Sequence, residues 1–354
     1  MSSSSPLPLS VCAWIGIDVS KLTLDACFLT LTSAGQEHKR HKRFANTPAG
    51  WQSLLDWVPQ MAPLQECHFA LEPTGAYGEG LALFLCCEQN LRLSLVNPAR
   101  VRHAALAAGM CNKTDKLDAY AIARFCRNEN PALYRPPAPE FRKLAALVRR
   151  RENLLDSVQQ EKNRLDQPAL DKEVKASLTR QVRFLEKELA RVEKALCEHV
   201  RSHAHLAADA ELLESIPGIS TLTSQKILAE LGDARDYASS GSAAAYAGLS
   251  PQQHASGTSV RRKTKLSKRG NAYLRKAMYF PTITALTWNP QVKVFYERLV
   301  AAGKPKMVAL GAAMRKLLMI AVGVLRSGKP FDPAWAERVQ QERQGQLQPA
   351  LAAT

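Results

Sequence analysis

Residues 141–205 contain no glycine and a single proline, Pro168, while apolar residues recur along them at helical spacing. Alternating steps of four and three residues, the heptad spacing of a coiled coil, join Leu178, Val182, Leu185, Leu189, Val192 and Leu196. Because proline interrupts a helix, we expect two long helices on either side of Pro168. They form either an antiparallel hairpin within one chain or an arm that joins copies of the chain, and the pattern leaves both open.

The part of the chain before these helices predicts a sheet. Residues 14–31 form two apolar, β-branched runs separated by polar residues, which is typical of a hairpin. Further strands are expected near 38–44, 67–73 and 91–98, and helices over 48–57, 79–89 and 113–127. A meander followed by strands that alternate with helices indicates an α/β sheet of the ribonuclease H type.

Three prolines within residues 133–140 mark a domain boundary. We therefore expect a disordered leader over 1–10, the α/β domain over 11–135, a coiled-coil arm over 136–206, a mainly helical domain over 207–339 and a flexible tail over 340–354. Residues 308–325 predict a core helix of the mainly helical domain. They are the closest approach to a membrane-spanning run, but Arg315 and Lys316 lie in their middle.

A turn at Pro217 and Gly218 separates two apolar helical segments within residues 212–233. This pattern resembles a helix-hairpin-helix, in which the turn and the N-terminus of the second helix bind a phosphate through backbone N–H groups. The same pattern is also typical of an ordinary corner between two helices. Gly218 is therefore either a nucleic-acid contact or only part of a corner between two helices.

The chain is strongly basic, with 48 Lys and Arg against 32 Asp and Glu and a formal net charge of +16. This excess favours a polyanionic partner, nucleic acid before an anionic membrane. The charge is densest over 256–276, where eight basic residues occur without an acid, although ordinary surfaces intersperse both signs. We expect phosphate contacts from Arg261, Arg262, Lys263, Lys265, Lys268 and Arg269.

Other classes of protein are disfavoured by what the sequence lacks. Its first residues have neither the basic start nor the apolar core of a signal peptide, so we expect a cytoplasmic protein without a membrane partner. The eight cysteines include no CxxC pair and no Cys/His spacing that suits zinc, which predicts reduced, buried thiols. Glycine-rich phosphate loops of the sugar-kinase and actin type are missing as well.

Four carboxylates are candidates for a metal site. Asp18 interrupts an apolar run, where an unpaired charge is costly to bury, and Glu72 ends an apolar strand. Asp115 and Asp118 are three residues apart on a predicted helix, so they share one face, and a bound cation relieves their repulsion. Each acid also has an ordinary alternative as a turn former, a helix-start residue or an exposed residue, and Asp25 shows the same ambiguity as a hairpin residue.

The order of the motifs GIDVSK, ALEPTGAY, a strand ending in VNP, and NKTDKLDA resembles that of the DEDD transposases of the insertion-sequence 110 family, which are related to pilin-gene DNA invertases. The resemblance continues through SIPGIS, AAYAGLSP, ASGTSV and LSKRGNAYLRKAMY, and it covers residues 14–331. It implies a RuvC-like N-terminal domain whose metal-binding tetrad is Asp18, Glu72, Asp115 and Asp118.

The same resemblance implies a serine nucleophile in the C-terminal domain, and the motif places it at Ser256. Gly257 would let a phosphate backbone approach closely, and the basic run that follows would hold the DNA strand. Ser250, Ser259 and Ser267 are rivals in the same predicted loop, while His254 suits a phosphate or solvent contact. A serine hydroxyl needs activation, and the metal is the natural activator.

The resemblance implies a prokaryotic, nucleoid-associated recombinase that cuts and rejoins DNA through a serine–DNA phosphodiester. It further implies Mg²⁺, with Mn²⁺ as a substitute. The element's own RNA is an expected guide, and the coiled coil favours a homodimer or homotetramer. Two alternatives remain: a RuvC-like, structure-specific endonuclease that uses metal-activated water, and a basic DNA-binding protein without catalytic activity.

Overall fold

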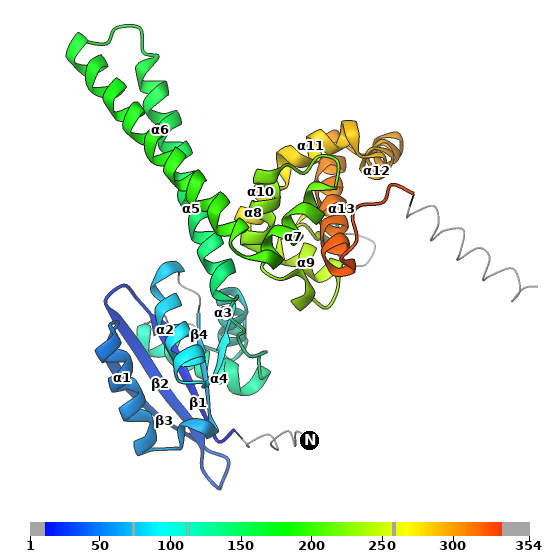
Figure 1. The fold of residues 1–354 in the computed structure, drawn as a ribbon. Helices are drawn as coiled ribbons and strands as arrows, with labels where there is room; N and C mark the ends of the chain where they lie inside the picture. The colour runs from blue at the N-terminus through cyan, green and yellow to red at the C-terminus, as the bar shows by residue number, and fades with distance from the viewer. Residues whose placement is uncertain (1–10, 73–74, 111, 113, 257–259, 335–354) are drawn as a thin grey trace, which may run out of the picture. The chain divides into compact units, whose positions relative to one another are not determined.

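The computed structural model describes residues 11–72, 75–110, 112, 114–256 and 260–334, and the side chains of residues 76 and 253–264 lie outside this description. The predicted leader, residues 1–10, and the predicted tail, residues 340–354, lie outside it as well. The chain divides into two compact units between Pro136 and Pro137 (Figure 1).

The first unit is built on a mixed, five-stranded sheet. Its strands are β1 (Ala13–Val19), β2 (Thr23–Leu31), β3 (Glu37–Ala45), β4 (Cys67–Leu71) and β5 (Arg92–Leu95). They lie in the order β3-β2-β1-β4-β5. The β3–β2 and β2–β1 pairs are antiparallel, and the β1–β4 and β4–β5 pairs are parallel. The predicted meander followed by parallel strands is confirmed.

The helices of this unit are α1 (Pro48–Trp57), α2 (Glu79–Leu83), α3 (Pro98–Ala107) and α4 (Asp115–Glu129), with short turns at Val58–Gln60, Leu64–Glu66, Gly75–Tyr77 and Phe84–Glu88. The prediction of one helix over 79–89 is wrong in part, because α2 ends at Leu83 and a π-helical turn follows. Helix α3 was not predicted. Asn97 caps it by accepting a hydrogen bond from the Ala99 N–H, and Pro98 occupies its first turn, as is typical of helix starts.

The two faces of the sheet pack differently. Ile15 and Ile17 of β1 join a core with α1 and α2 on one face, whereas Gly16 faces α4 on the other. A Cβ atom on Gly16 would lie 2.1 Å from the Ala119 carbonyl oxygen and 2.3 Å from the Ala123 nitrogen. Helix α4 therefore crosses β1 in direct backbone contact, which no residue with a side chain allows.

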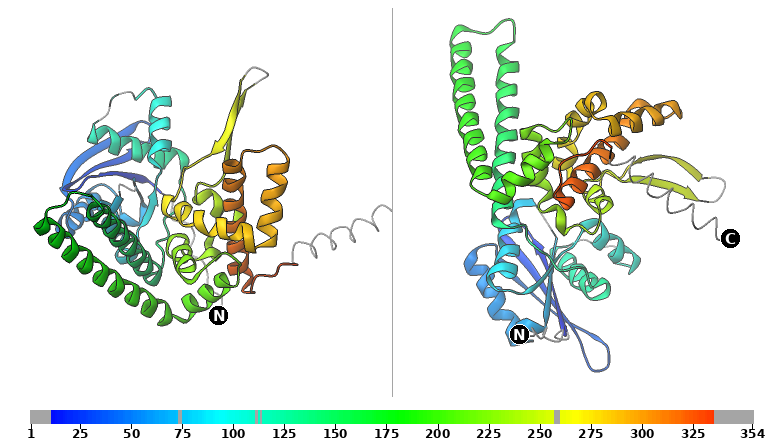
Figure 2. Two further views of the ribbon diagram at one scale, coloured as in Figure 1. Left: turned by 90° about the horizontal axis from the view of Figure 1, so that it is seen from above. Right: turned by 45° about the vertical axis from the view of Figure 1, so that its right-hand side comes forward.

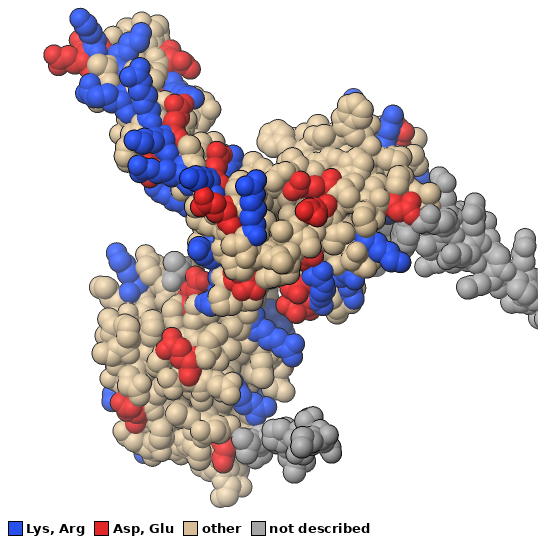
Figure 3. Space-filling view, in the orientation of Figure 1, with Lys and Arg blue, Asp and Glu red and all other residues tan. Residues whose placement is uncertain are grey.

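The second unit begins with two long helices, α5 (Pro139–Leu165) and α6 (Lys172–Arg201), which lie side by side as an antiparallel hairpin (Figures 1 and 2). Two helices separated near Pro168 were predicted and are confirmed. Ion pairs cross between them, from Lys162 to Glu186 at 2.8 Å and from Arg151 to Glu193 at 2.7 Å. Figure 3 shows Lys and Arg densely placed along this hairpin and mixed with acidic side chains.

The remaining helices of the second unit are α7 (Ala204–Glu214), α8 (Thr221–Leu231), α9 (Ser240–Tyr246), α10 (Ala272–Ala277), α11 (Tyr279–Trp288), α12 (Pro290–Ala301) and α13 (Lys306–Ser327), with a short turn at Ala234–Asp236. Among the described residues, α13 alone is long and apolar enough to cross a membrane. Its Leu317 and Leu318 are fully buried inside this unit, and the predicted core helix is confirmed.

The basic segment that was predicted to be a loop is a β-hairpin instead. Strands β6 (Pro251–Ser256) and β7 (Val260–Leu266) pair antiparallel, with Ser256 opposite Val260 and an irregularity between Gln252 and His254. The sequence of these strands does not alternate between apolar and polar residues, because β7 carries the basic run. Local composition therefore predicted their charge but not their conformation.

Candidate active site

Two of the candidate carboxylates lie side by side at the ends of neighbouring strands. Strands β1 and β4 are parallel, and their last backbone pair joins Ile17 to Leu71. Asp18 is the next residue of β1, and Glu72 directly follows the end of β4. Because side chains alternate along a strand, Asp18 lies on the face of Gly16, which α4 covers. Ala70, which pairs with Gly16 and precedes Glu72 by two residues, lies on this face as well, so continued alternation would bring Glu72 to it.

Helix α4 brings the other two carboxylates to this face. Thr114 caps the helix by accepting a hydrogen bond from the Leu117 N–H at 3.3 Å, which places Asp115 and Asp118 in the first turn. Asp118 directly precedes Ala119, the residue whose carbonyl oxygen contacts Gly16 of β1. The close crossing of helix and strand thus holds Asp118 near the strand that carries Asp18.

Two further residues, which the sequence analysis did not assign to the site, lie at the same corner. Asp25 of β2 is the cross-strand partner of Asp18, and its side chain is only 8% exposed. The guanidinium of Arg43, on β3, donates to Asp25 at 2.9 Å and to Asp115 at 3.0 Å. Asp25 is thus a buried partner of a cation as well as a hairpin residue, and Arg43 links the sheet to the start of α4.

The residues present fit a divalent cation by kind, and the elements that carry them share one face of the sheet. Oxygen ligands of carboxylates are those that Mg²⁺ prefers, and β1, the end of β4 and the first turn of α4 supply them on one face. Within the described part of the chain, however, no three His, Cys, Asp or Glu side chains are close enough together to hold a metal ion. Asp115 forms an ion pair with Arg43 instead.

Strand β3 adds a basic edge beside this corner. Residues 38–43 read HKRHKR, and all six side chains are exposed on the outermost strand of the sheet. Lys39 lies 4.2 Å from the ring centroid of Tyr120 on α4, and burial together with Lys39 and Lys116 lowers the pKa of His41. The consecutive basic residues were visible in the sequence. Charged side chains on an edge strand also prevent it from pairing with other chains, so these basic residues need no role in binding DNA.

The second unit carries the serine candidates. Ser256 is the last residue of β6. The structure does not describe Ser259 or the side chains of Ser256, His254, Arg261, Arg262 and Lys263. Lys265, Lys268 and Arg269 are exposed, as expected of phosphate contacts. The rival Ser250 accepts a hydrogen bond from Arg315 at 2.8 Å, which indicates a structural task for that hydroxyl.

The turn at Gly218 joins α7 to α8, as the predicted pair of helices requires. A Cβ atom on Gly218 would lie 2.8 Å from the Ala285 Cβ, so α11 packs against this turn. Glu214 accepts hydrogen bonds from Thr221 and Ser224 in the first turn of α8, where a bound phosphate would meet its negative charge. The phosphate contact stays a prediction, and both observations favour the ordinary corner.

Two family models match the chain. One for DEDD transposases of the IS110 type, described as "Transposase", matches residues 15–173, and one described as "Transposase IS116/IS110/IS902 family" matches residues 210–297. The pilin gene-inverting protein of Moraxella lacunata is 33% identical over 321 residues, which are 90% of this chain and 97% of that protein. The chain belongs to the IS110 family of transposases.

A second relative agrees with this assignment, and one solved structure was matched. The pilin gene-inverting protein of Moraxella bovis is 32% identical over 90% of the transposase described here and 97% of its own length. RuvC of T. thermophilus, solved in complex with a Holliday junction substrate, has a TM-score of 0.27 and 14% identity, covering 34% of this transposase and 98% of its own chain. Because the chain belongs to this transposase family, it is a DNA recombinase, and DNA is its partner.

Proposed function

We propose that this transposase cuts and rejoins DNA by a metal-dependent reaction at Asp18, Glu72, Asp115 and Asp118 of a RuvC-like domain, with Ser256 as the nucleophile. The observation that carries the proposal is the parallel register of β1 and β4, which sets Asp18 beside Glu72 on the face that α4 covers. We take Mg²⁺ as the ion, with Mn²⁺ as a substitute. It would neutralise charge on the scissile phosphate and promote loss of the serine proton.

The chain's own groups then perform a transesterification. The Ser256 Oγ forms a bond to phosphorus while the bond from phosphorus to the leaving DNA oxygen breaks, and that oxygen takes up a proton. Attack by a hydroxyl of the new DNA end reverses the step and frees the serine. Since one phosphodiester replaces another at each stage, rejoining requires no nucleotide hydrolysis.

Basic surfaces in both units suit the DNA backbone. The exposed edge of β3 runs beside the carboxylates of the first unit, and Lys265, Lys268 and Arg269 are exposed next to the β6–β7 hairpin. Contacts of this kind bind phosphates with little choice of sequence. They are consistent with a reaction in which a paired RNA, rather than the protein, selects the site.

Replacing Ser256 with alanine tests the nucleophile. We expect wild-type protein, mixed with DNA that carries the element's end and stopped with detergent, to retain a covalent protein–DNA adduct on a denaturing gel. The S256A variant should form none, because no other group replaces the attacking hydroxyl. Ser267→Ala, which removes a neighbouring hydroxyl, is the matched control and should keep the adduct.

A different result would favour the second candidate, a structure-specific endonuclease that uses metal-activated water. The observation in its favour is that all four carboxylates belong to the first unit, without Ser256. If S256A still cleaves DNA and wild type never forms an adduct, the serine mechanism is wrong and Ser256 is a DNA contact. An adduct that persists in S256A would assign the attack to another residue.

We also propose an element-encoded guide RNA and association of chains through the α5–α6 hairpin. Phe184 and Val174 of α6 are 57% and 47% exposed, so the hairpin retains apolar surface for a second copy. Nucleic acid recovered from purified protein should contain one structured RNA from the element's flank, and light scattering should give the mass of a dimer or tetramer. Random fragments would count against guidance, and a monomeric mass against association.

A further inference from the structure

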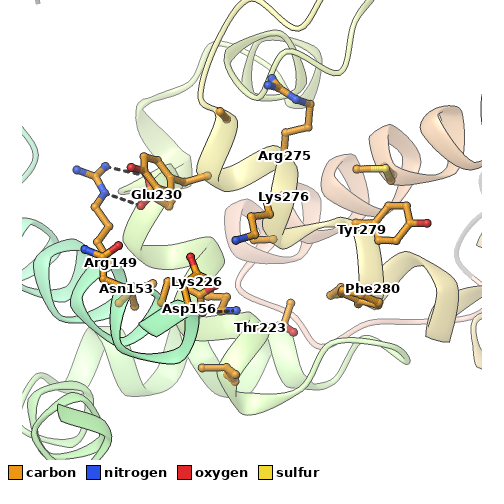
Figure 4. A pocket seen from close by; sticks show the side chains of 18 residues that line it. Arg149, Asn153, Asp156, Thr223, Lys226, Glu230, Arg275, Lys276, Tyr279 and Phe280 are labelled. Carbon is orange, nitrogen blue, oxygen red and sulfur yellow. Dashed lines mark hydrogen bonds and ion pairs between the residues drawn. The ribbon is translucent and has the colours of Figure 1, made fainter. Parts of the chain in front are cut away.

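A cavity of about 740 Å³ opens in the second unit, and helices α5, α8, α10, α11 and α13 line it (Figure 4). Its volume lies within the range of about 300–1,000 Å³ that is typical of pockets for small organic groups. Most of its lining surface is apolar, and polar side chains converge on it from α5 and α8. None of the roles proposed above uses this cavity.

One wall of the cavity combines aromatic and basic side chains. Met278 keeps helical dihedral angles, so α10 continues into α11, and steps of three and four residues place Tyr273, Lys276 and Phe280 on one helical face. All three line the cavity. Tyr273 is 55% exposed and Phe280 is 75% exposed, so their rings have faces that no part of this unit covers.

Two of the acids that line the cavity are already paired. Glu230, whose side chain is 2% exposed, accepts hydrogen bonds from Arg149 at 2.8 and 2.9 Å and from Asn271 at 2.9 Å. Glu152 forms an ion pair with Lys226 at 2.7 Å. The same Arg149 guanidinium lies 5.0 Å from the ring centroid of Tyr273, which holds that ring in place.

The unpaired charges are arranged around the rings. Among the described residues, neither Lys276 nor Asp156 takes part in an ion pair, and both line the cavity. Figure 4 shows Lys276 on α10 and Asp156 on the opposite helix, α5, beside Asn153. The cavity thus offers a cation next to exposed rings on one side, and hydrogen-bond acceptors on the other.

We infer that this cavity binds an unpaired base of a single-stranded nucleic acid. The base stacks on Tyr273 and Phe280, Lys276 binds an adjacent phosphate, and Asp156 accepts a hydrogen bond from an exocyclic amine. Bases within a duplex are covered by their neighbours on both faces, so the site selects single strands or flipped bases. The inference rests on the proposed function in one respect, namely that the chain binds an RNA guide and cuts the DNA that pairs with it.

The test uses full-length protein with magnesium chelated, so that binding is measured without cleavage. The probes are a single-stranded DNA oligonucleotide and an RNA of the same sequence, each with a central 2-aminopurine, whose fluorescence falls when it stacks on an aromatic ring. We expect quenching with the wild type. The Y273L/F280L double variant should lose it and bind at least about tenfold more weakly, because base stacking on each ring contributes measurably to affinity.

Matched variants separate stacking from other effects. Tyr273→Phe keeps the ring and should retain the quenching. Trp288→Leu removes a ring that is 71% exposed at the end of α11 and does not line the cavity, and it should also retain the quenching. Lys276→Gln leaves both rings in place and should lower the slope of log affinity against log salt by about 0.7, the value for one phosphate contact on a single strand. It serves as the second variant if the double variant does not fold.

The outcomes decide between occupants. Unchanged quenching and affinity in Y273L/F280L, or an unchanged salt slope in K276Q, would overturn the inference. Loss of oligomeric mass in the double variant, with oligonucleotide binding intact, would overturn it in favour of a protein partner. Loss of quenching with RNA alone or with DNA alone supports the site and identifies the strand that occupies it. Because the assay contains no magnesium, it can succeed even if the proposed serine and metal chemistry fails.

Discussion

Replacing Asp18 with asparagine should reduce DNA cleavage by roughly a thousandfold or more, although the variant should fold normally. Asparagine keeps the size of the side chain but removes the negative charge that would bind the proposed metal ion. Without that ion, the charge on the scissile phosphate is not neutralised. Single-turnover cleavage of DNA carrying the element's end, measured across a range of Mg²⁺ concentrations, gives the effect. Asp118→Asn should behave alike, because α4 holds Asp118 on the same face of the sheet.

Asp56→Asn is the matched control for these variants. Asp56 lies exposed on α1, which covers the opposite face, and its carboxylate accepts a hydrogen bond from Gln52 within the same helix. Its cleavage rate should equal that of the wild type. Metal binding measured by calorimetry should weaken in D18N and not in D56N. If D18N retains more than about a tenth of the wild-type rate, the metal site is elsewhere.

Replacing Gly16 with alanine should destabilise the first unit by about 3 kcal/mol or more, which is a large effect for a single methyl group. The added Cβ would lie 2.1 Å from a backbone oxygen and 2.3 Å from a backbone nitrogen of α4, so the helix itself must move away. Urea unfolding followed by the fluorescence of Trp14, Trp51 and Trp57 reports on this unit. Cleavage should fall as well, since Asp118 moves with α4.

Gly323→Ala provides the comparison. Gly323 lies within α13, and a Cβ atom added there would meet no atom within 4 Å. Alanine should therefore be neutral or stabilise the second unit by up to about 1 kcal/mol, because it favours the helix. Unfolding of G16A at the same urea concentration as the wild type would show that α4 does not depend on direct backbone contact with β1.

Local signals predicted most elements of the first unit. The helix over 48–57 and the strand that begins at Cys67 agree with the structure, because apolar spacing and a proline at the helix start are properties of adjacent residues. The helix predicted over 113–127 corresponds to α4, which Thr114 caps. Helix α3 was missed although Asn97 and Pro98 are a typical helix start, because its apolar spacing is weak. The hairpin of β6 and β7 was missed because β7 carries the basic run.

The sequence by itself determined the kinds of group in the candidate site and their order along the chain. An acid in an apolar run, an acid after a strand and two acids one helical turn apart are local facts, and the motifs that contain them are sufficient to recognise the family. Strand register and helix packing were decided only by the tertiary structure, because they depend on contacts between residues far apart in sequence. This is why the pairing of Arg43 with Asp25 and Asp115, and the cavity beside Tyr273 and Phe280, had no signal in any single segment.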